Sequence, residues 1–146
     1  MDVRKVTLSE LNGVLDLIDQ YDRPVSDRPG ATAVGRIFAS IQQAGGAVVG
    51  AFVEGKLVGT CTVNMCANLS WSGRPYAIIE NVIVAPEQRG KGIGKAVLQY
   101  AQNYAHEAGC YKVALMTGSK KPETLKFYED AGLRGDKIGF QRRFGA

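Results

Sequence analysis

A short basic turn between an apolar run and a helical pattern holds three glycines at alternate positions: Gly90, Gly92 and Gly94. The first amide N–H groups of a helix have no acceptor within the helix, and the helix dipole favours an anion beside them. Glycines have no Cβ, so an anion such as phosphate can approach those amides closely. Three cations surround the turn: Arg89, Lys91 and Lys95. The pattern predicts an anion site, and a glycine-rich loop that only turns the chain stays open as the alternative.

Two common nucleotide-binding turns do not match this stretch. A P-loop places Ser or Thr after its lysine, so that the hydroxyl can hold Mg²⁺, whereas Ala96 follows Lys95 here. A dinucleotide-binding turn has the spacing G-x-G-x-x-G and lies in a parallel β-α-β unit near the start of its fold. This turn has the spacing G-x-G-x-G and comes late in the chain, after a predicted hairpin. The sequence of this turn therefore matches neither a P-loop nor a dinucleotide-binding turn.

Glu80 is the only acidic residue in the apolar run Tyr76–Val84, which is expected to form a strand just before the turn. A carboxylate inside an apolar strand costs free energy unless it has a partner or a chemical task. A glutamate on a solvated face of the strand explains the residue equally well. The residues alone leave these two interpretations open.

The elements that must position these residues follow from periodicity and turn signals. Glu54-Gly55 predicts a two-residue turn between two β-rich runs, and Pro122 predicts the first position of a helix. The expected order is β-α-α-β-β-β-α-β-α-β, a mixed α/β fold in one domain spanning residues 1–146. The expected elements are strands near 3–6, 47–53, 56–65, 76–84, 111–117 and 137–144, and helices near 8–18, 34–41, 92–108 and 122–131.

Composition limits the classes of protein to which the chain can belong. With 146 residues, 45% of them hydrophobic and 22% charged, it has the make-up of one globular domain. A net charge of +4 suits an anionic ligand and is too weak to indicate a nucleic-acid partner. The N-terminus has no apolar stretch and no run is long enough to span a membrane, so a cytoplasmic protein is expected. Three cysteines without metal-ligand spacing predict reduced packing residues and no metal site.

Three motifs resemble those of the GNAT N-acetyltransferases. Residues 89–94 fit that family's R/Q-x-x-G-x-G/A signature, between a strand and a helix as the family requires. "GCYKVAL" (109–115) and "LKFYEDAGL" (125–133) resemble its later elements. The resemblance covers Ala47 to Leu133 and implies a central, mostly antiparallel, twisted sheet flanked by helices. Within the family the motifs are most similar to those of glucosamine-6-phosphate N-acetyltransferases.

The resemblance implies that the anion is the pyrophosphate of acetyl-CoA, held by the turn and the start of the helix. By position these residues are Gln88, Arg89, Gly90, Lys91, Gly92, Ile93, Gly94 and Lys95. The strand residues Val82, Ile83 and Val84 match those whose backbone pairs with the pantetheine arm like an added strand. Phe127 and Lys121 match further cofactor positions, and Lys121 stands where many members carry asparagine.

The resemblance also implies catalytic roles for two residues. Acetyl transfer needs a neutral amine, and a lysine-like amine with a pKa near 10.4 is almost fully protonated at pH 7. Glu80 is the expected base, acting directly or through water. Tyr128 matches the tyrosine that protonates the departing thiolate, and a core aromatic residue paired with Phe127 is the alternative for it.

The expected activity is transfer of acetyl from acetyl-CoA to the primary amine of a small molecule, by direct attack in a ternary complex. A non-catalytic CoA-binding module and a protein N-acetyltransferase are the alternatives. The acceptor is expected to be bound by the first two helices and the loop "YDRPVSDRPGATAV" (21–34). Met116 or Thr117 stands where the aminosugar enzymes carry aspartate, which argues against an aminosugar phosphate. No nucleic-acid or membrane partner is expected, and dimerisation, common in the family, predicts a homodimer.

Overall fold

A five-stranded sheet forms the centre of the computed structural model, which describes residues 1–21 and 26–145. Its strands follow the order of the chain: β1 (Asp2–Lys5), β2 (Ala47–Val53), β3 (Lys56–Cys66), β4 (Tyr76–Val84) and β5 (Val113–Ala114). All neighbours are antiparallel except β4 and β5, which are parallel. The prediction of a mixed α/β fold with a mostly antiparallel sheet is confirmed.

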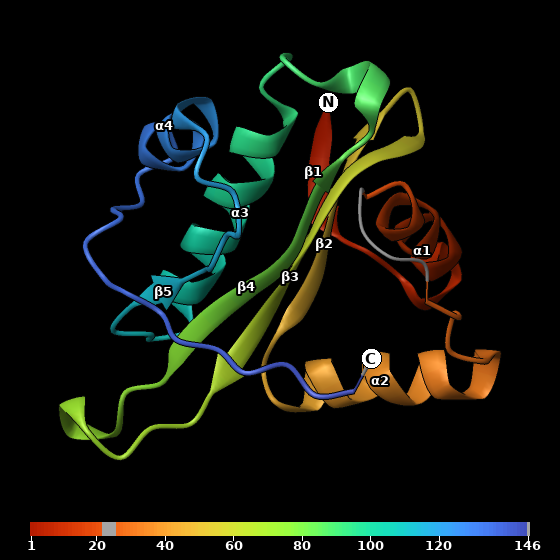
Figure 1. Cartoon of the computed structure of the whole chain (residues 1–146). Helices are drawn as coiled ribbons and strands as arrows, with labels where there is room; N and C mark the ends of the chain where they lie inside the picture. Colours follow the sequence, from red (N-terminus) through yellow and green to blue (C-terminus); the bar gives the residue numbers. More distant parts are fainter. Residues whose placement is uncertain (22–25, 146) are drawn as a thin grey trace.

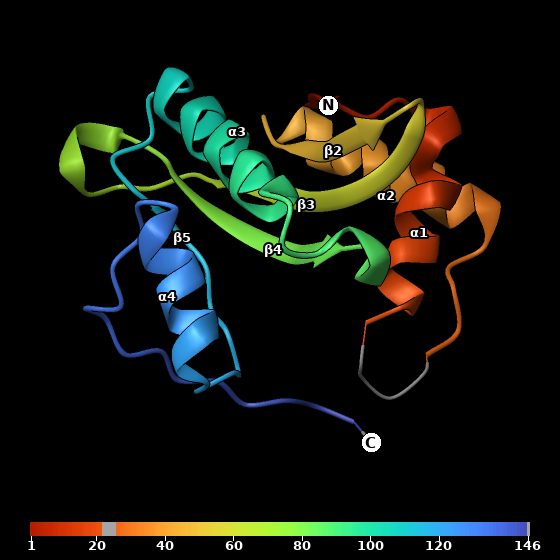
Figure 2. The same cartoon turned by 90° about the horizontal axis from the view of Figure 1, so that it is seen from above.

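Helices cover both faces of the sheet (Figures 1 and 2). The helices α1 (Leu11–Asp19) and α2 (Ala31–Gln43) lie on one face. The helices α3 (Ile93–Glu107) and α4 (Pro122–Asp130) lie on the other. Three single 3₁₀ turns complete the elements: η1 (Leu8–Glu10), η2 (Trp71–Gly73) and η3 (Pro86–Gln88). The turn that carries the anion-site glycines lies between η3 and α3.

The main core lies between the sheet and α3. Ile93, Val97 and Ala101, which share one apolar face of that helix, are all buried there. A second cluster on the opposite face joins α1 and α2 to β2, where Phe38 and Phe52 are buried. The sheet is therefore held from both sides, which fixes the strand that leads into the glycine turn.

The three cysteines are free in the structure, as predicted. Burial raises the pKa of the Cys61 thiol to about 12, so this residue stays protonated at neutral pH. It lies within the main core and is a packing residue.

A bulge bends β4 in the middle. Thr62 pairs with Glu80 and Thr60 pairs with Ile83, so two residues of β4 lie opposite the single residue between those threonines. Asn81 takes the extra position, with a φ of 56° in the left-handed region that asparagine tolerates better than most residues. Bulges of this kind increase the local twist and redirect side chains.

The pairing between β4 and β5 is confined to the start of β4. It involves Ala77 with Val113 and Ile78 with Ala114. From residue 79 onward, the β5-side edge of β4 has no strand partner among the described residues. An unpaired edge presents free N–H and C=O groups to an added chain or ligand. This free edge runs directly toward the glycine turn.

Two predictions about strands need correction. The strand predicted over 111–117 is real only at Val113–Ala114, and the one predicted over 137–144 is wrong, because residues 133–145 form no strand. Ile138, Phe140 and Phe144 alternate as a strand would, yet each is more than 80% exposed. A strand needs a partner, and the described part of the chain offers this tail none.

Candidate active site

The turn after β4 opens onto the start of α3. Gly92 is the N-cap of α3, with φ 80° and ψ 6°, and Gly90 also has a positive φ of 78°. These are left-handed conformations that residues with a Cβ rarely adopt. A Cβ built at either glycine would meet no atom within 4 Å. Both glycines are therefore required by the backbone, and the space beside them is open.

The amide N–H groups of residues 90–95 donate to no acceptor within residues 1–21 and 26–145. The first bond of the helix runs from the amide of Ala96 to the carbonyl of Gly92, at 3.1 Å, and no side chain caps the helix. Arg89, Lys91 and Lys95 are exposed around these amides. Lys91 Nζ donates to Gln88 Oε1 at 3.4 Å. The arrangement has open amides and exposed positive charges, the features that the sequence predicts for an anion site.

Gly94 has a different role from the other two glycines. A Cβ on Gly94 would lie 2.9 Å from Phe127 Cζ and 3.4 Å from Val84 Cγ2. The absence of a side chain at Gly94 lets the Phe127 ring of α4 pack against the first turn of α3. Phe127 therefore lies behind the turn and supports it from the protein side.

We expect Gly94→Ala to destabilise the fold by about 1 kcal/mol, because overpacking outweighs the helix preference of alanine. Phe127→Leu should remove the clash and recover most of that loss in the double variant. Urea unfolding of the two single variants and the double variant would measure the coupling. Strictly additive losses would show that Gly94 and Phe127 do not share a contact that matters for stability.

Glu80 is exposed on the face of the sheet that carries α1 and α2. The register pairs Val48 with Thr62 and Thr62 with Glu80, and residues directly opposite one another project to the same face. Among the described residues, no hydrogen bond or ion pair engages the Glu80 carboxylate. It is therefore free to accept a proton from a ligand on that face.

Three residues of β4 between Glu80 and the turn are partly or fully buried. Ile83 is 7% exposed, and Val82 and Val84 pack against the same core. Their side chains hold the strand in place, so a ligand can reach their backbone only along the free edge of β4. This geometry suits the predicted pairing with an extended ligand.

Tyr128 is half-buried on α4, where its ring meets Phe127 edge-on with centroids 5.0 Å apart. Burial, and then the neighbouring Tyr21 phenol, raise the pKa of Tyr128 above its usual value of 10. Its hydroxyl makes no hydrogen bond within the part of the chain that the structure describes. Tyr128 is therefore a protonated, unengaged donor at neutral pH. The edge-on packing is observed, and proton donation stays a prediction for this residue.

Lys121 lies at the start of the same helix, as its N-cap residue. Its amide donates to Ser119 Oγ at 3.3 Å, and its side chain is exposed. No described carboxylate lies within ion-pair distance of its ammonium group. The side chain is thus available to an anionic ligand.

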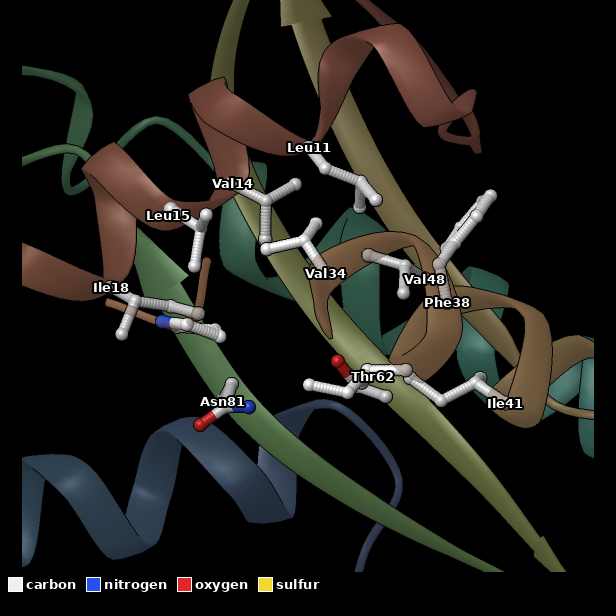
Figure 3. A pocket seen from close by; sticks show the side chains of 12 residues that line it. Leu11, Val14, Leu15, Ile18, Val34, Phe38, Ile41, Val48, Thr62 and Asn81 are labelled. Atoms are coloured by element: carbon white, nitrogen blue, oxygen red, sulfur yellow. The ribbon is translucent and has the colours of Figure 1, made fainter. Parts of the chain in front are cut away.

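A pocket of about 130 Å³ lies between α1, α2 and the sheet (Figure 3). Side chains of both helices line it, and Thr62 and Asn81 form its edge on β3 and β4. Asn81 is a residue that sequence reasoning missed as part of a site. The one signal was its type, because asparagine is favoured where a strand adopts a positive φ. Pro29 and Val34 of the 21–34 segment also line the pocket, while residues 22–25 lie outside the described residues.

Other candidate residues lie elsewhere. Trp71 stacks on Tyr111 with ring centroids 5.2 Å apart and is not among the residues that line the pocket. Across residues 1–21 and 26–145, no cluster of three or more His, Cys, Asp or Glu is arranged to hold a metal ion. None of the described helices is both long enough and apolar enough to cross a membrane.

Known proteins share both this sequence pattern and this fold. The family model for "Acetyltransferase (GNAT) family" matches residues 12–133. Glucosamine 6-phosphate N-acetyltransferase of Trypanosoma brucei brucei is 29% identical over 138 residues, covering 92% of this chain and 89% of that protein. Aminoalkylphosphonate N-acetyltransferase of Salmonella typhimurium is 28% identical over 92 residues, covering 61% of this chain and 57% of that protein.

Solved structures agree with the family match. A chain from Agrobacterium tumefaciens superposes with a TM-score of 0.88 at 36% identity, covering 99% of this chain and all of that one. Glucosamine-6-phosphate N-acetyltransferase of Arabidopsis thaliana superposes with a TM-score of 0.85 at 26% identity, covering 99% of this chain and 98% of that one. The chain therefore belongs to the acetyltransferase (GNAT) family of acetyl-CoA-dependent N-acetyltransferases.

Proposed function

We propose that this enzyme transfers an acetyl group from acetyl-CoA to the primary amine of a small molecule, by direct attack of the amine in a ternary complex. The observation that carries the proposal is the row of open amides at the start of α3, reached along the free edge of β4. When bound, acetyl-CoA supplies the activated acyl thioester. An open row of donors beside a strand edge suits a ligand with an extended arm and a diphosphate.

The cofactor-binding residues act in two groups. Residues 88–95 hold the diphosphate through backbone amides and the positive charges of Arg89, Lys91 and Lys95. The backbone of residues 82–84 pairs with the pantetheine arm and offers an N–H that polarises the thioester carbonyl. Lys121 meets a phosphate of the cofactor, and Phe127 keeps the turn in place from behind.

Glu80 acts as the general base that removes the proton of the ammonium group, directly or through one water molecule. Its unengaged carboxylate on the pocket face of β4 supports this role. The neutral amine then attacks the carbonyl, the C–S bond breaks as Tyr128 donates its proton to the departing thiolate, and the nitrogen loses its extra proton to water.

We expect Glu80→Gln to lower kcat/KM about 10²-fold at pH 7, the usual size of a general-base contribution. The defect should shrink as the pH approaches the pKa of the free amine, because much of the amine is then already neutral and needs no base. Steady-state rates from pH 6.5 to 9.5 would measure it. Glu107→Gln, at the far end of α3, is the matched control. A pH-independent defect, or none, would remove Glu80 from this role.

A thiol-release assay with acetyl-CoA and a panel of small amines tests the proposal directly. Amine-dependent release supports a small-molecule acetyltransferase. Binding of acetyl-CoA without release for any small amine or peptide would instead support a non-catalytic CoA-binding module. Release with peptides alone would support a protein N-acetyltransferase.

We also propose that the enzyme is a homodimer, in which a second copy covers the tail after α4. Ile138, Phe140 and Phe144 are each more than 80% exposed within residues 138–144, and clustered exposed apolar groups are typical of interaction surfaces. Light scattering should show a dimer for the native protein and a monomer for Phe140→Asp. Leu69→Asp, at a fully exposed site elsewhere, should leave the dimer intact. A native monomer would contradict the proposal.

A further inference from the structure

We infer that the acceptor is a primary amine whose body is a small apolar group, such as a branched alkyl or phenyl group, and not a sugar phosphate. The inference rests on the proposed function, because it concerns the acceptor of that reaction. It begins with the pocket beside Glu80, whose lining is apolar except for Thr62 and Asn81 (Figure 3). The apolar side chains come from both helices and include Leu11, Val14, Ile18, Val34, Ile37 and Ile41.

The size of the pocket limits the acceptor body. Its volume of about 130 Å³ is close to that of the apolar cavity of about 150 Å³ that accommodates benzene in an engineered protein. A phenyl ring or a branched chain of about five carbons therefore matches the space. A sugar of similar size would have to bury several hydroxyl groups among aliphatic side chains.

The polar groups of the pocket are all on one side. Thr62 and Asn81 lie on β3 and β4, and neither side chain makes a hydrogen bond within residues 1–21 and 26–145. Glu80 lies directly opposite Thr62 on the same face of the sheet. The amine of an acceptor is best bound at this edge, where two unengaged polar groups and a carboxylate meet. Its body then extends toward α2, between aliphatic side chains.

No described residue that lines the pocket carries a charge. Two arginines are adjacent in sequence to lining residues: Arg36, which is exposed, precedes Ile37, and Arg28 precedes Pro29. The Arg28 guanidinium is held by Asp16 at 2.6 Å and by Asp19 at 2.7 Å, and these bonds raise its pKa. A phosphate inside the pocket would therefore meet aliphatic groups, because Arg28 is already paired and Arg36 is not among the lining residues. Burying an unpaired phosphate in such a site is strongly unfavourable.

Thiol-release rates with four acceptors test the inference: methylamine, 3-methylbutylamine, benzylamine and glucosamine 6-phosphate. We expect kcat/KM for 3-methylbutylamine to exceed that for methylamine by at least about 10²-fold, because each methylene in a fitted apolar pocket contributes roughly tenfold or more. Glucosamine 6-phosphate should be at least 10²-fold poorer than 3-methylbutylamine, on the order expected for unpaired polar groups. A preference for glucosamine 6-phosphate would overturn the inference while leaving acetyl transfer intact.

A variant at the pocket rim gives a second test. Ile37 lines the pocket but is 48% exposed, so Ile37→Ser should fold normally. We expect it to lower kcat/KM for 3-methylbutylamine about tenfold more than kcat/KM for methylamine, because methylamine does not reach α2. Leu8→Ser, at an exposed apolar residue outside the pocket, is the matched control. Equal effects on both amines would contradict the assigned pocket.

Calorimetric titration of 3-methylbutylamine into the enzyme with CoA bound separates failure of the apolar-acceptor inference from failure of the proposed acetyl transfer. Binding that weakens in Ile37→Ser supports the pocket even if no turnover is seen, a result that would remove only the proposed function. Turnover of glucosamine 6-phosphate without measurable binding of 3-methylbutylamine would remove only the inference. Neither binding nor turnover of any of the four would overturn both.

Discussion

Gly92→Glu is expected to abolish acetyl-CoA binding in calorimetry. Gly92 is the N-cap of α3, has a φ of 80°, and faces open space. A glutamate there would place a carboxylate on the amides of residues 93–95, at the position that suits a diphosphate. Losing two charge-assisted hydrogen bonds of about 1.5 kcal/mol each weakens binding about 10²-fold, and charge repulsion adds to this loss.

Two further variants separate this effect from strain in the backbone. Gly92→Ala keeps the strain, on the order of 1–2 kcal/mol in the left-handed region, but adds no charge. It should retain acetyl-CoA binding within about tenfold. Gly109→Glu introduces the same substitution at a positive φ of 86°, beyond the opposite end of α3, and should bind normally. Retained affinity in Gly92→Glu, with a normal melting temperature, would show that the diphosphate is bound elsewhere.

Local features of the fold were predictable because neighbours in sequence determine them. Glu54 and Gly55 form the expected hairpin turn, with φ values of 51° and 77° that match a type I′ turn. The Thr7–Glu10 capping box is present, and the Thr7 amide donates to Glu10 Oε1 at 2.8 Å. Pro122 begins α4 as expected. Each of these signals acts within one turn of the chain.

The prediction of a strand over 137–144 was wrong because the alternation of apolar and polar residues indicates only a propensity to form a strand. Whether a strand forms depends on a partner with free N–H and C=O groups. β5 is two residues long, so it leaves little edge for another strand of the same chain. The sequence of the tail gives no information about that partner.

The candidate site also has parts that local sequence predicts and parts that depend on contacts between distant residues. The glycine turn was predictable because its charges, glycines and helix start lie within seven residues of sequence, from Arg89 to Lys95. The packing of Gly94 against Phe127 was not, since it joins two helices far apart in the chain. The pocket depends on the same kind of distant contact. The bulge at Asn81 depends on the register between β3 and β4, which no single strand specifies.

Charge compensation was the feature hardest to foresee. The loop between the first two helices contains Arg28, a cation close in sequence to the pocket. Arg28 pairs with Asp16 and Asp19 on α1, so its charge is not available to the pocket. Helix formation places both carboxylates on one face, because their spacing of three residues brings them together. The inferred acceptor class rests on this pairing and on the aliphatic lining, not on the net charge.

Tyr128→Phe is expected to lower kcat by about 10²- to 10³-fold, within the usual range for loss of a general acid. The phenol is protonated because burial raises its pKa, and its hydroxyl is unengaged by the described residues. Removing one oxygen leaves the edge-on contact with Phe127 in place. The Kd for acetyl-CoA should therefore change by less than about twofold, since the ring still packs and only the proton is lost.

The protonation state of Tyr128 also predicts how the rate depends on pH. The acid form of Tyr128 is the active one, so the native rate is lost only as the pH rises through a pKa above 10. Between pH 7 and pH 9 the ratio of native to Tyr128→Phe rates should stay constant, because the phenol remains protonated throughout. Tyr100→Phe, at a half-buried tyrosine of α3, is the matched control and should keep full activity. Full activity of Tyr128→Phe would leave this ring with a packing role alone, and the departing thiolate would then have to take its proton from water.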